Sequence, residues 1–203
     1  MWRRDDLHGG DRVLDITNDA PQYVYLFNII QRQYSMKEII VKDSDLSNAA
    51  LEGMDEFLKV ITDAIYKAIG GELNADNMGE LNADQITLLA YIILRDSVMD
   101  GGFVELIHNG YGPFIYLNPF NKAVRNWGLR DLFKINSETH RLYSKYHEAI
   151  EKDCTQEEFD ALYEQYPEFD DYDDVFVENE EQFTADIAHY VDEHLDNFCK
   201  IEQ

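Results

Sequence analysis

Apolar side chains recur every three or four residues along most of the chain, and this spacing restricts the fold more than any other feature of the sequence. Residues 54–69 show it clearly, and the glycine pair 70–71 follows them. Residues three and four apart line one face of an α-helix, and glycine is common just after a helix ends. Only residues 175–177 weakly resemble a β-strand. The sequence therefore predicts an all-α or nearly all-α fold, in a single multi-helix globular domain.

The longest apolar stretch, residues 86–94, predicts a helix at the centre of this domain. The stretch is apolar on every side, which is typical of a buried helix, and it is about half as long as the roughly 20 residues of a membrane span. Asn82 and Gln85 have the spacing of a capping box, so the helix is expected to begin there. The Asp-Gly-Gly sequence at 100–102 is expected to end it, before a second, short helix.

A last helix is predicted over residues 181–198, after a shorter one that begins at Thr155 with Glu158 as its capping partner. Projection at about 100° per residue places the large apolar side chains of the last helix on one arc. The opposite arc carries five carboxylates, which belong to Glu181, Asp186, Asp192, Glu193 and Asp196. We expect the apolar arc to pack on the core and the acidic arc to face solvent.

Charge is concentrated in the last quarter of the chain. Residues 151–203 contain 19 acidic and 2 basic residues, a net charge of −17 within a total of −24. A protein binds nucleic acid or anionic lipid by neutralising phosphates with basic side chains. The acidic excess therefore argues against direct binding to nucleic acid or to a membrane. It leaves a basic protein, bound cations or simple solubility as the use of this charge.

Residues 164–182 contain nine acidic residues, four aromatic residues and no basic residue. One interpretation is a solvated loop that its aromatic side chains hold to the core. The other is an acidic surface of fixed shape, whose carboxylates stand where the phosphates of a DNA duplex would. On that second interpretation the predicted partner-binding residues are Asp170, Asp171, Asp173, Asp174, Glu178, Glu181, Asp186, Asp192, Glu193 and Asp196. Charge reversal at residues 170, 171, 173 and 174 is then expected to weaken binding without unfolding the domain.

Patterns that indicate catalysis or metal binding are weak. The sequence contains no phosphate-binding loop, hydrolase serine motif, zinc-protease motif or dinucleotide fingerprint. A calcium loop aligned on Gly79 fails at two ligand positions. Asp186, His189 and Glu193 share a helical face and could form a metal triad, although a surface histidine between acids explains them more simply. We expect no catalytic activity, no cofactor and no metal, with a metal-dependent hydrolase as the competing hypothesis.

The remaining features concern the compartment and the domain boundaries. Cys154 and Cys199 are too few for a disulfide framework or a metal quartet, so we expect reduced thiols, as in cytosolic proteins. No apolar stretch follows the first residues, so no signal peptide is expected. We therefore expect a soluble, cytoplasmic protein. The length fits one domain, residues 18–203, after an N-terminal extension of residues 1–17.

Residues 95–112 contain a motif that is similar to one in a known family. The residues that match are Gly101, Gly102, Phe103, Asn109 and Gly112. In this motif the chain resembles the bacterial DNA-mimic protein family, long described as a domain of unknown function. Asp100 stands where the family often has asparagine, and Ser97 replaces the glutamate ahead of the motif. The motif itself is interpreted as structural, because the glycine pair permits a tight turn and Phe103 is expected to pack inward.

The resemblance implies both a mainly helical fold and a function. The studied type of the family is an acidic dimer that occupies the DNA-binding face of a transcription factor. For this chain the resemblance implies a non-enzymatic protein of transcription regulation, a basic, DNA-binding partner and a homodimer. An immunity-type or regulatory protein, with a toxin or an enzyme as its partner, is the alternative within the same class of binding proteins.

Overall fold

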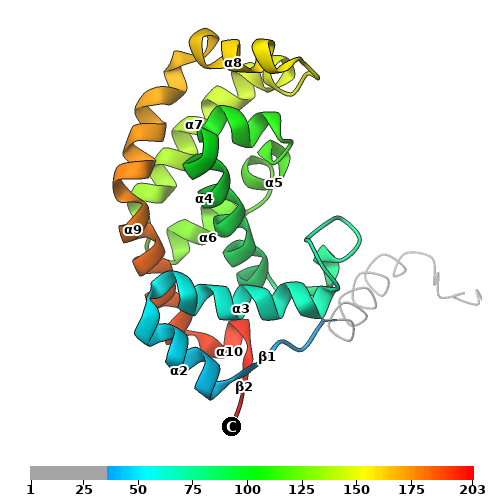
Figure 1. The fold of residues 1–203 in the computed structure, drawn as a ribbon, viewed down its shortest axis with the longest axis vertical. Helices are drawn as coiled ribbons and strands as arrows, with labels where there is room; N and C mark the ends of the chain where they lie inside the picture. The colour runs from blue at the N-terminus through cyan, green and yellow to red at the C-terminus, as the bar shows by residue number, and fades with distance from the viewer. Residues whose placement is uncertain (1–35) are drawn as a thin grey trace, which may run out of the picture. The chain divides into compact units, whose positions relative to one another are not determined.

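The computed structural model describes residues 36–203. In chain order the elements are β1 (Ile40–Lys42), α2 (Asp43–Glu52), α3 (Met54–Ile69), η1 (Met78–Glu80), α4 (Ala83–His108), α5 (Gly112–Tyr116), α6 (Phe120–Asn126), α7 (Arg130–Ile150), α8 (Gln156–Gln165), η2 (Pro167–Phe169), α9 (Asp170–Glu193), α10 (Leu195–Phe198) and β2 (Lys200–Glu202) (Figure 1). The prediction of a nearly all-α fold in a single helical domain is confirmed. The predicted extension, residues 1–17, and the domain start at residue 18 lie outside the described residues.

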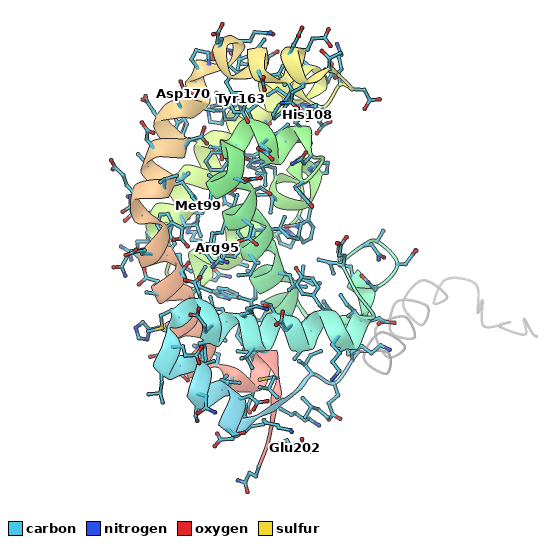
Figure 2. The ribbon with its side chains drawn as sticks, viewed as in Figure 1. Arg95, Met99, His108, Tyr163, Asp170 and Glu202 are labelled. Carbon is cyan, nitrogen blue, oxygen red and sulfur yellow. The ribbon has the colours of Figure 1, made fainter. Side chains whose placement is uncertain are left out.

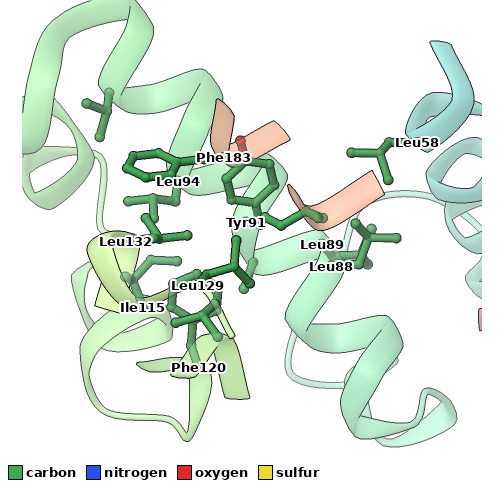
Figure 3. Close-up of a cluster of buried hydrophobic side chains, with 14 of the residues drawn as sticks. Leu58, Leu88, Leu89, Tyr91, Leu94, Ile115, Phe120, Leu129, Leu132 and Phe183 are labelled. Atoms are coloured by element: carbon green, nitrogen blue, oxygen red, sulfur yellow. The ribbon is translucent and has the colours of Figure 1, made fainter. Parts of the chain in front are cut away.

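Helix α4 lies at the centre of the helical unit, as its apolar sequence predicts. Leu88, Tyr91 and Leu94 are fully buried, and Figure 3 shows them among side chains from the surrounding helices. Helices α3, α5, α6, α7 and α9 all contact α4. The predicted capping box is present: the Asn82 side chain accepts a hydrogen bond from the Gln85 N–H (2.9 Å), and the Gln85 side chain accepts one from the Asn82 N–H (3.0 Å). None of the described helices is long and apolar enough to cross a membrane.

Helix α4 bends at residues 101–102, where the sequence predicts an end. Both glycines depart from helical backbone angles, and Gly102 has a φ of +72°, a conformation that favours glycine. Helical structure resumes at Phe103, whose ring is fully buried, as predicted, against Phe176 of α9, with ring centroids 6.0 Å apart. Residues from both sides of the bend belong to the same hydrophobic core. The glycine pair therefore redirects the helix without dividing the core.

The acidic segment of residues 164–182 is helical, so its interpretation as a loop is wrong. Helix α8 ends at Gln165, and α9 runs unbroken from Asp170 to Glu193, through the weak strand pattern at 175–177. The predicted last helix thus begins earlier than residue 181 and ends before α10. Phe169 and Phe176 are fully buried and anchor its first turns. Aspartates in the first turn also stabilise a helix, because they lie at the positive end of its dipole.

Two short strands join the ends of the described chain, and the sequence did not predict them. β1 and β2 pair in parallel, with Ile40 opposite Lys200 and Lys42 opposite Glu202. The Lys200 N–H also donates to the Ile39 carbonyl (2.8 Å). Three residues are too few to show the alternation by which a strand is recognised in a sequence. This pairing fixes the residues that follow α10 beside those that precede α2.

Candidate partner-binding surface

Helix α9 lies along the outside of the helical unit (Figure 1), and its exposed side carries a row of acidic residues. Phe176, Phe183, Ile187 and Val191 turn its apolar side inward, where α9 contacts α3, α4 and α7. The helix has no lysine or arginine. Its exposed acidic residues, which we define as the α9 acidic face, are Asp170, Asp171, Asp174, Glu178, Glu181, Asp186, Asp192 and Glu193. Figure 2 shows Asp170 at the beginning of this face, and the last residue of the predicted set, Asp196, is exposed on α10.

Asp173 differs from the other predicted residues because it points toward the bend in α4. One carboxylate oxygen accepts a hydrogen bond from the Phe103 N–H (2.8 Å), and a Cβ on Gly102 would lie 2.6 Å from the other oxygen. Burial raises the pKa of Asp173 to about 7, against the lowering effect of the Phe103 hydrogen bond. Asp173 therefore links α9 to α4. The expectation that charge reversal at residue 173 leaves the fold intact does not agree with this contact.

We expect Asp173 to make stability depend on pH. Its folded pKa is raised from 3.8 to about 7, so folding favours the protonated carboxyl. That contribution is complete below the unfolded pKa and is lost as the pH rises through the folded pKa. Asp173→Asn keeps an acceptor for the Phe103 N–H and does not titrate. Between about pH 5 and about pH 8, urea unfolding should show wild type losing about 1–3 kcal/mol more than this variant. Equal losses would contradict the assignment.

A polar network fixes the middle of α9, and the sequence analysis missed it. The Arg95 side chain of α4, only 18% exposed, lies 2.5 Å from Asp55 of α3, 3.0 Å from Asp96 and 3.9 Å from Glu180 of α9. Thr184 donates to the same Glu180 oxygen (2.7 Å) and shares a hydrogen bond of 2.7 Å with Tyr91. The only signal for it in the sequence is a charged residue at the end of an apolar run. The network holds the α9 acidic face in one position on α3 and α4.

The residues of the glycine motif lie around the second half of α4 and the start of α5. Asn109 follows the last residue of α4 as its C-cap, and Gly112 begins α5. Gly112 is buried, and a Cβ there would lie 2.3 Å from Cε2 of Tyr143 in α7. The Tyr143 ring is stacked on that of Tyr116, with centroids 4.8 Å apart. The motif therefore permits close packing of α5 against α7 and makes no part of the acidic face.

Gly112→Ala is expected to lower the free energy of unfolding by about 1–3 kcal/mol, because the added methyl group overpacks the Tyr143 ring. Gly79→Ala is the matched control, since nothing lies within 4 Å of a Cβ at that position. Its free energy of unfolding should change by less than about 0.5 kcal/mol. Urea titration of both variants gives the difference. Equal stabilities would mean that the ring moves aside at no cost.

Among the described residues, neither a metal-binding cluster nor a disulfide contributes to this surface. Within 36–203, no group of three or more His, Cys, Asp or Glu side chains could hold a metal. The alternative triad of Asp186, His189 and Glu193 is therefore not formed. Cys154 is exposed and Cys199 is buried, and burial raises the pKa of the Cys199 thiol to about 11. What α9 presents to solvent is negative charge on a fixed helix.

Comparison with known proteins identifies relatives over the same region. A family model described as DMP19-like protein matches residues 79–194. The DNA mimic protein DMP19 of Neisseria meningitidis serogroup B (strain ATCC BAA-335 / MC58) is 31% identical over 129 residues, which are 63% of this chain and 78% of that protein. The residues matched by the family model contain α4 to α9, and with them the glycine motif and the whole α9 acidic face.

Proposed function

The chain belongs to the DMP19-like protein family, and from this premise we propose that it is a DNA mimic whose α9 acidic face occupies the nucleic-acid-binding surface of a basic protein, such as a transcription factor. The relative from Neisseria meningitidis is itself named a DNA mimic protein. The partner of the present chain is proposed from the chemistry of its own surface.

The observation that carries the proposal is the α9 acidic face itself. It is a single helical surface with eight exposed carboxylates and no lysine or arginine. Asp170, Asp174 and Glu178 lie at successive four-residue intervals, which advance by about 6 Å along a helix axis. Phosphates of one B-DNA strand advance by about 3.4 Å and carry one charge each. These three carboxylates therefore form a line of negative charge with a little more than half the axial density of one DNA strand, which a basic groove built for phosphates can meet.

The fixed position of these carboxylates separates a mimic from a merely soluble acidic surface. Phe176 and Phe183 anchor α9 by burial, and Glu180 and Thr184 connect it to Arg95 and Tyr91. Complementary charge steers association and fixes the register of the two surfaces, provided that the charges are held in place. Exposed charges are screened beyond about 8–10 Å at physiological salt. Binding should therefore weaken as salt is added.

The experiment is capture from a lysate of the host, with the full chain as bait, at low and moderate salt and with or without competing duplex DNA. The proposal requires a basic DNA-binding protein that is retained at low salt and displaced by DNA. A matched bait with asparagine or glutamine in place of the acids at 174, 178 and 181 should retain clearly less of it. A non-basic partner that ignores both salt and DNA would favour the immunity-type or regulatory function instead. Retention of no protein would contradict the proposal.

The same proposal has consequences for compartment, assembly and chemistry. A protein that competes with DNA for its partner acts in the bacterial cytoplasm, without catalytic activity, as a regulator of transcription. The family resemblance further implies a homodimer. Sedimentation velocity on the full chain measures that assembly directly. A monomer at micromolar concentration would contradict the homodimer.

A further inference from the structure

A groove lies between α7 and α9, beside the α9 acidic face, with a volume of about 380 Å³. Ile135 of α7 and Phe183 of α9, both buried, and the exposed Val175 of α9 supply its apolar lining. We propose that this α7–α9 groove binds the apolar side chains of a basic, amphipathic helix in the partner protein. The inference rests on the proposed function and adds the partner's secondary structure and the source of selectivity.

The groove places apolar surface within a charged face. Val175 is 42% exposed and lies one helical turn from Asp171 on the same side of α9. Burying apolar surface is favourable by about 25 cal/mol per Å², and salt does not screen this contribution as it screens charge. The volume falls within the range of about 300–1,000 Å³ that is common for binding pockets. A partner with apolar side chains at this position would gain affinity that carboxylates alone do not supply.

The rim of the groove determines the charge of the occupant. Asp131 and Glu138 of α7 and Asp171 of α9 all line it. Lys134 is the one basic residue among the described residues of the lining, and its ammonium group lies 2.7 Å from Asp131. The remaining carboxylates complement a basic occupant and oppose an acidic one, such as a second copy of α9. Charge complementarity therefore selects a basic segment.

The direction of the groove favours a helix as that segment. Its lining residues recur every three or four positions on both walls, at 131–138 on α7 and at 171–183 on α9. The groove consequently follows the axes of two neighbouring helices. An amphipathic helix fills such a groove with residues at three- and four-residue spacing and keeps its basic residues at the rim. Many DNA-binding proteins present a helix of this kind to the major groove.

The test uses the full chain and two synthetic helical peptides. One peptide has lysines on one face and leucines on the other, and the second has the same lysines with glutamine in place of each leucine. Val175→Asn changes the groove, and Val177→Asn is the matched control, because Val177 is 49% exposed on the same helix and does not line the groove. Fluorescence anisotropy at low and moderate salt measures the affinity of each variant for each peptide.

We expect the leucine-containing peptide to bind more tightly to wild type, with a difference that persists at moderate salt. Val175→Asn should weaken the binding of that peptide about 5- to 10-fold and leave the affinity for the lysine–glutamine peptide unchanged. Val177→Asn should change neither affinity. Equal effects of the two variants, or equal affinity for the two peptides, would overturn the groove and leave the charge-based function standing. If charge reversal at 174, 178 and 181 alters neither affinity while Val175→Asn does, the proposed function fails instead.

Discussion

Replacing Arg95 by methionine should lower the free energy of unfolding by about 2–4 kcal/mol, the largest loss of stability that we expect from a single side chain on this surface. The Arg95 side chain is 18% exposed and that of Glu180 is 16% exposed, so neither is well solvated. Methionine retains the packing of the arginine stem but leaves the Glu180 carboxylate near Asp55 and Asp96 without a cation. Loss of one partner in such a pair costs more than the pair contributes, because an uncompensated charge remains.

The control for Arg95 lies in its exposed partners. Asp96→Asn also removes one ion pair, but the Asp96 side chain is 62% exposed and water replaces the contact. Its free energy of unfolding should change by less than about 1 kcal/mol. Urea unfolding of the two variants at the same pH gives both values. If Arg95→Met is as stable as Asp96→Asn, the network does not hold α9, and the fixed position of the acidic face loses its main support.

The parts of the fold that the sequence predicted are those with local causes. The start of α4 depends on Asn82 and Gln85, three residues apart, and its bend depends on Gly101 and Gly102, which are adjacent. Both could be read without knowing any other part of the chain. The pairing of β1 with β2 joins residues at opposite ends of the described chain, so no local sequence pattern predicts it.

The sequence alone does not decide whether residues 170–180 form a helix or a loop. Their acidic composition disfavours compact structure, whereas burial of their aromatic side chains favours it. Closely spaced acids disfavour a compact structure, and this made a solvated loop a reasonable interpretation. Phe169 and Phe176 are fully buried by contacts from other helices, and those contacts outweigh the repulsion between exposed carboxylates. The aromatic residues that could have anchored a loop instead anchor one face of a helix.

Contacts between residues far apart in the sequence also limit what can be predicted of the candidate site. Solvent exposure of Asp174 and Glu178 follows from helical periodicity once α9 is known. The same periodicity places Asp173 and Glu180 on the buried arc with Phe176. Their partners, the Phe103 N–H and Arg95, lie far away in the sequence. Acidic composition alone therefore could not separate carboxylates that face a partner from those that hold the helix.

Charge reversal on the α9 acidic face, with Asp174→Lys, Glu178→Lys and Glu181→Lys together, should weaken binding to the captured DNA-binding protein about 30- to 1,000-fold. Each reversal removes an attraction and adds a repulsion, at roughly 1 kcal/mol or somewhat more per residue. The three side chains are exposed and lie beyond the first turn of α9, so circular dichroism and urea unfolding should change little.

The same change in net charge at another surface decides whether the face or the total charge matters. Glu52→Lys, Glu56→Lys and Asp76→Lys alter three exposed acids outside α9 by the same amount. Long-range steering depends on the summed field of the protein, so this control should slow association modestly, and more so at low salt. A local mimic surface also depends on carboxylates that contact the partner directly, and their loss raises the dissociation rate. Equal losses of affinity in the two triple variants at about 0.15 M salt would therefore mean that the α9 acidic face acts only through its contribution to the net charge.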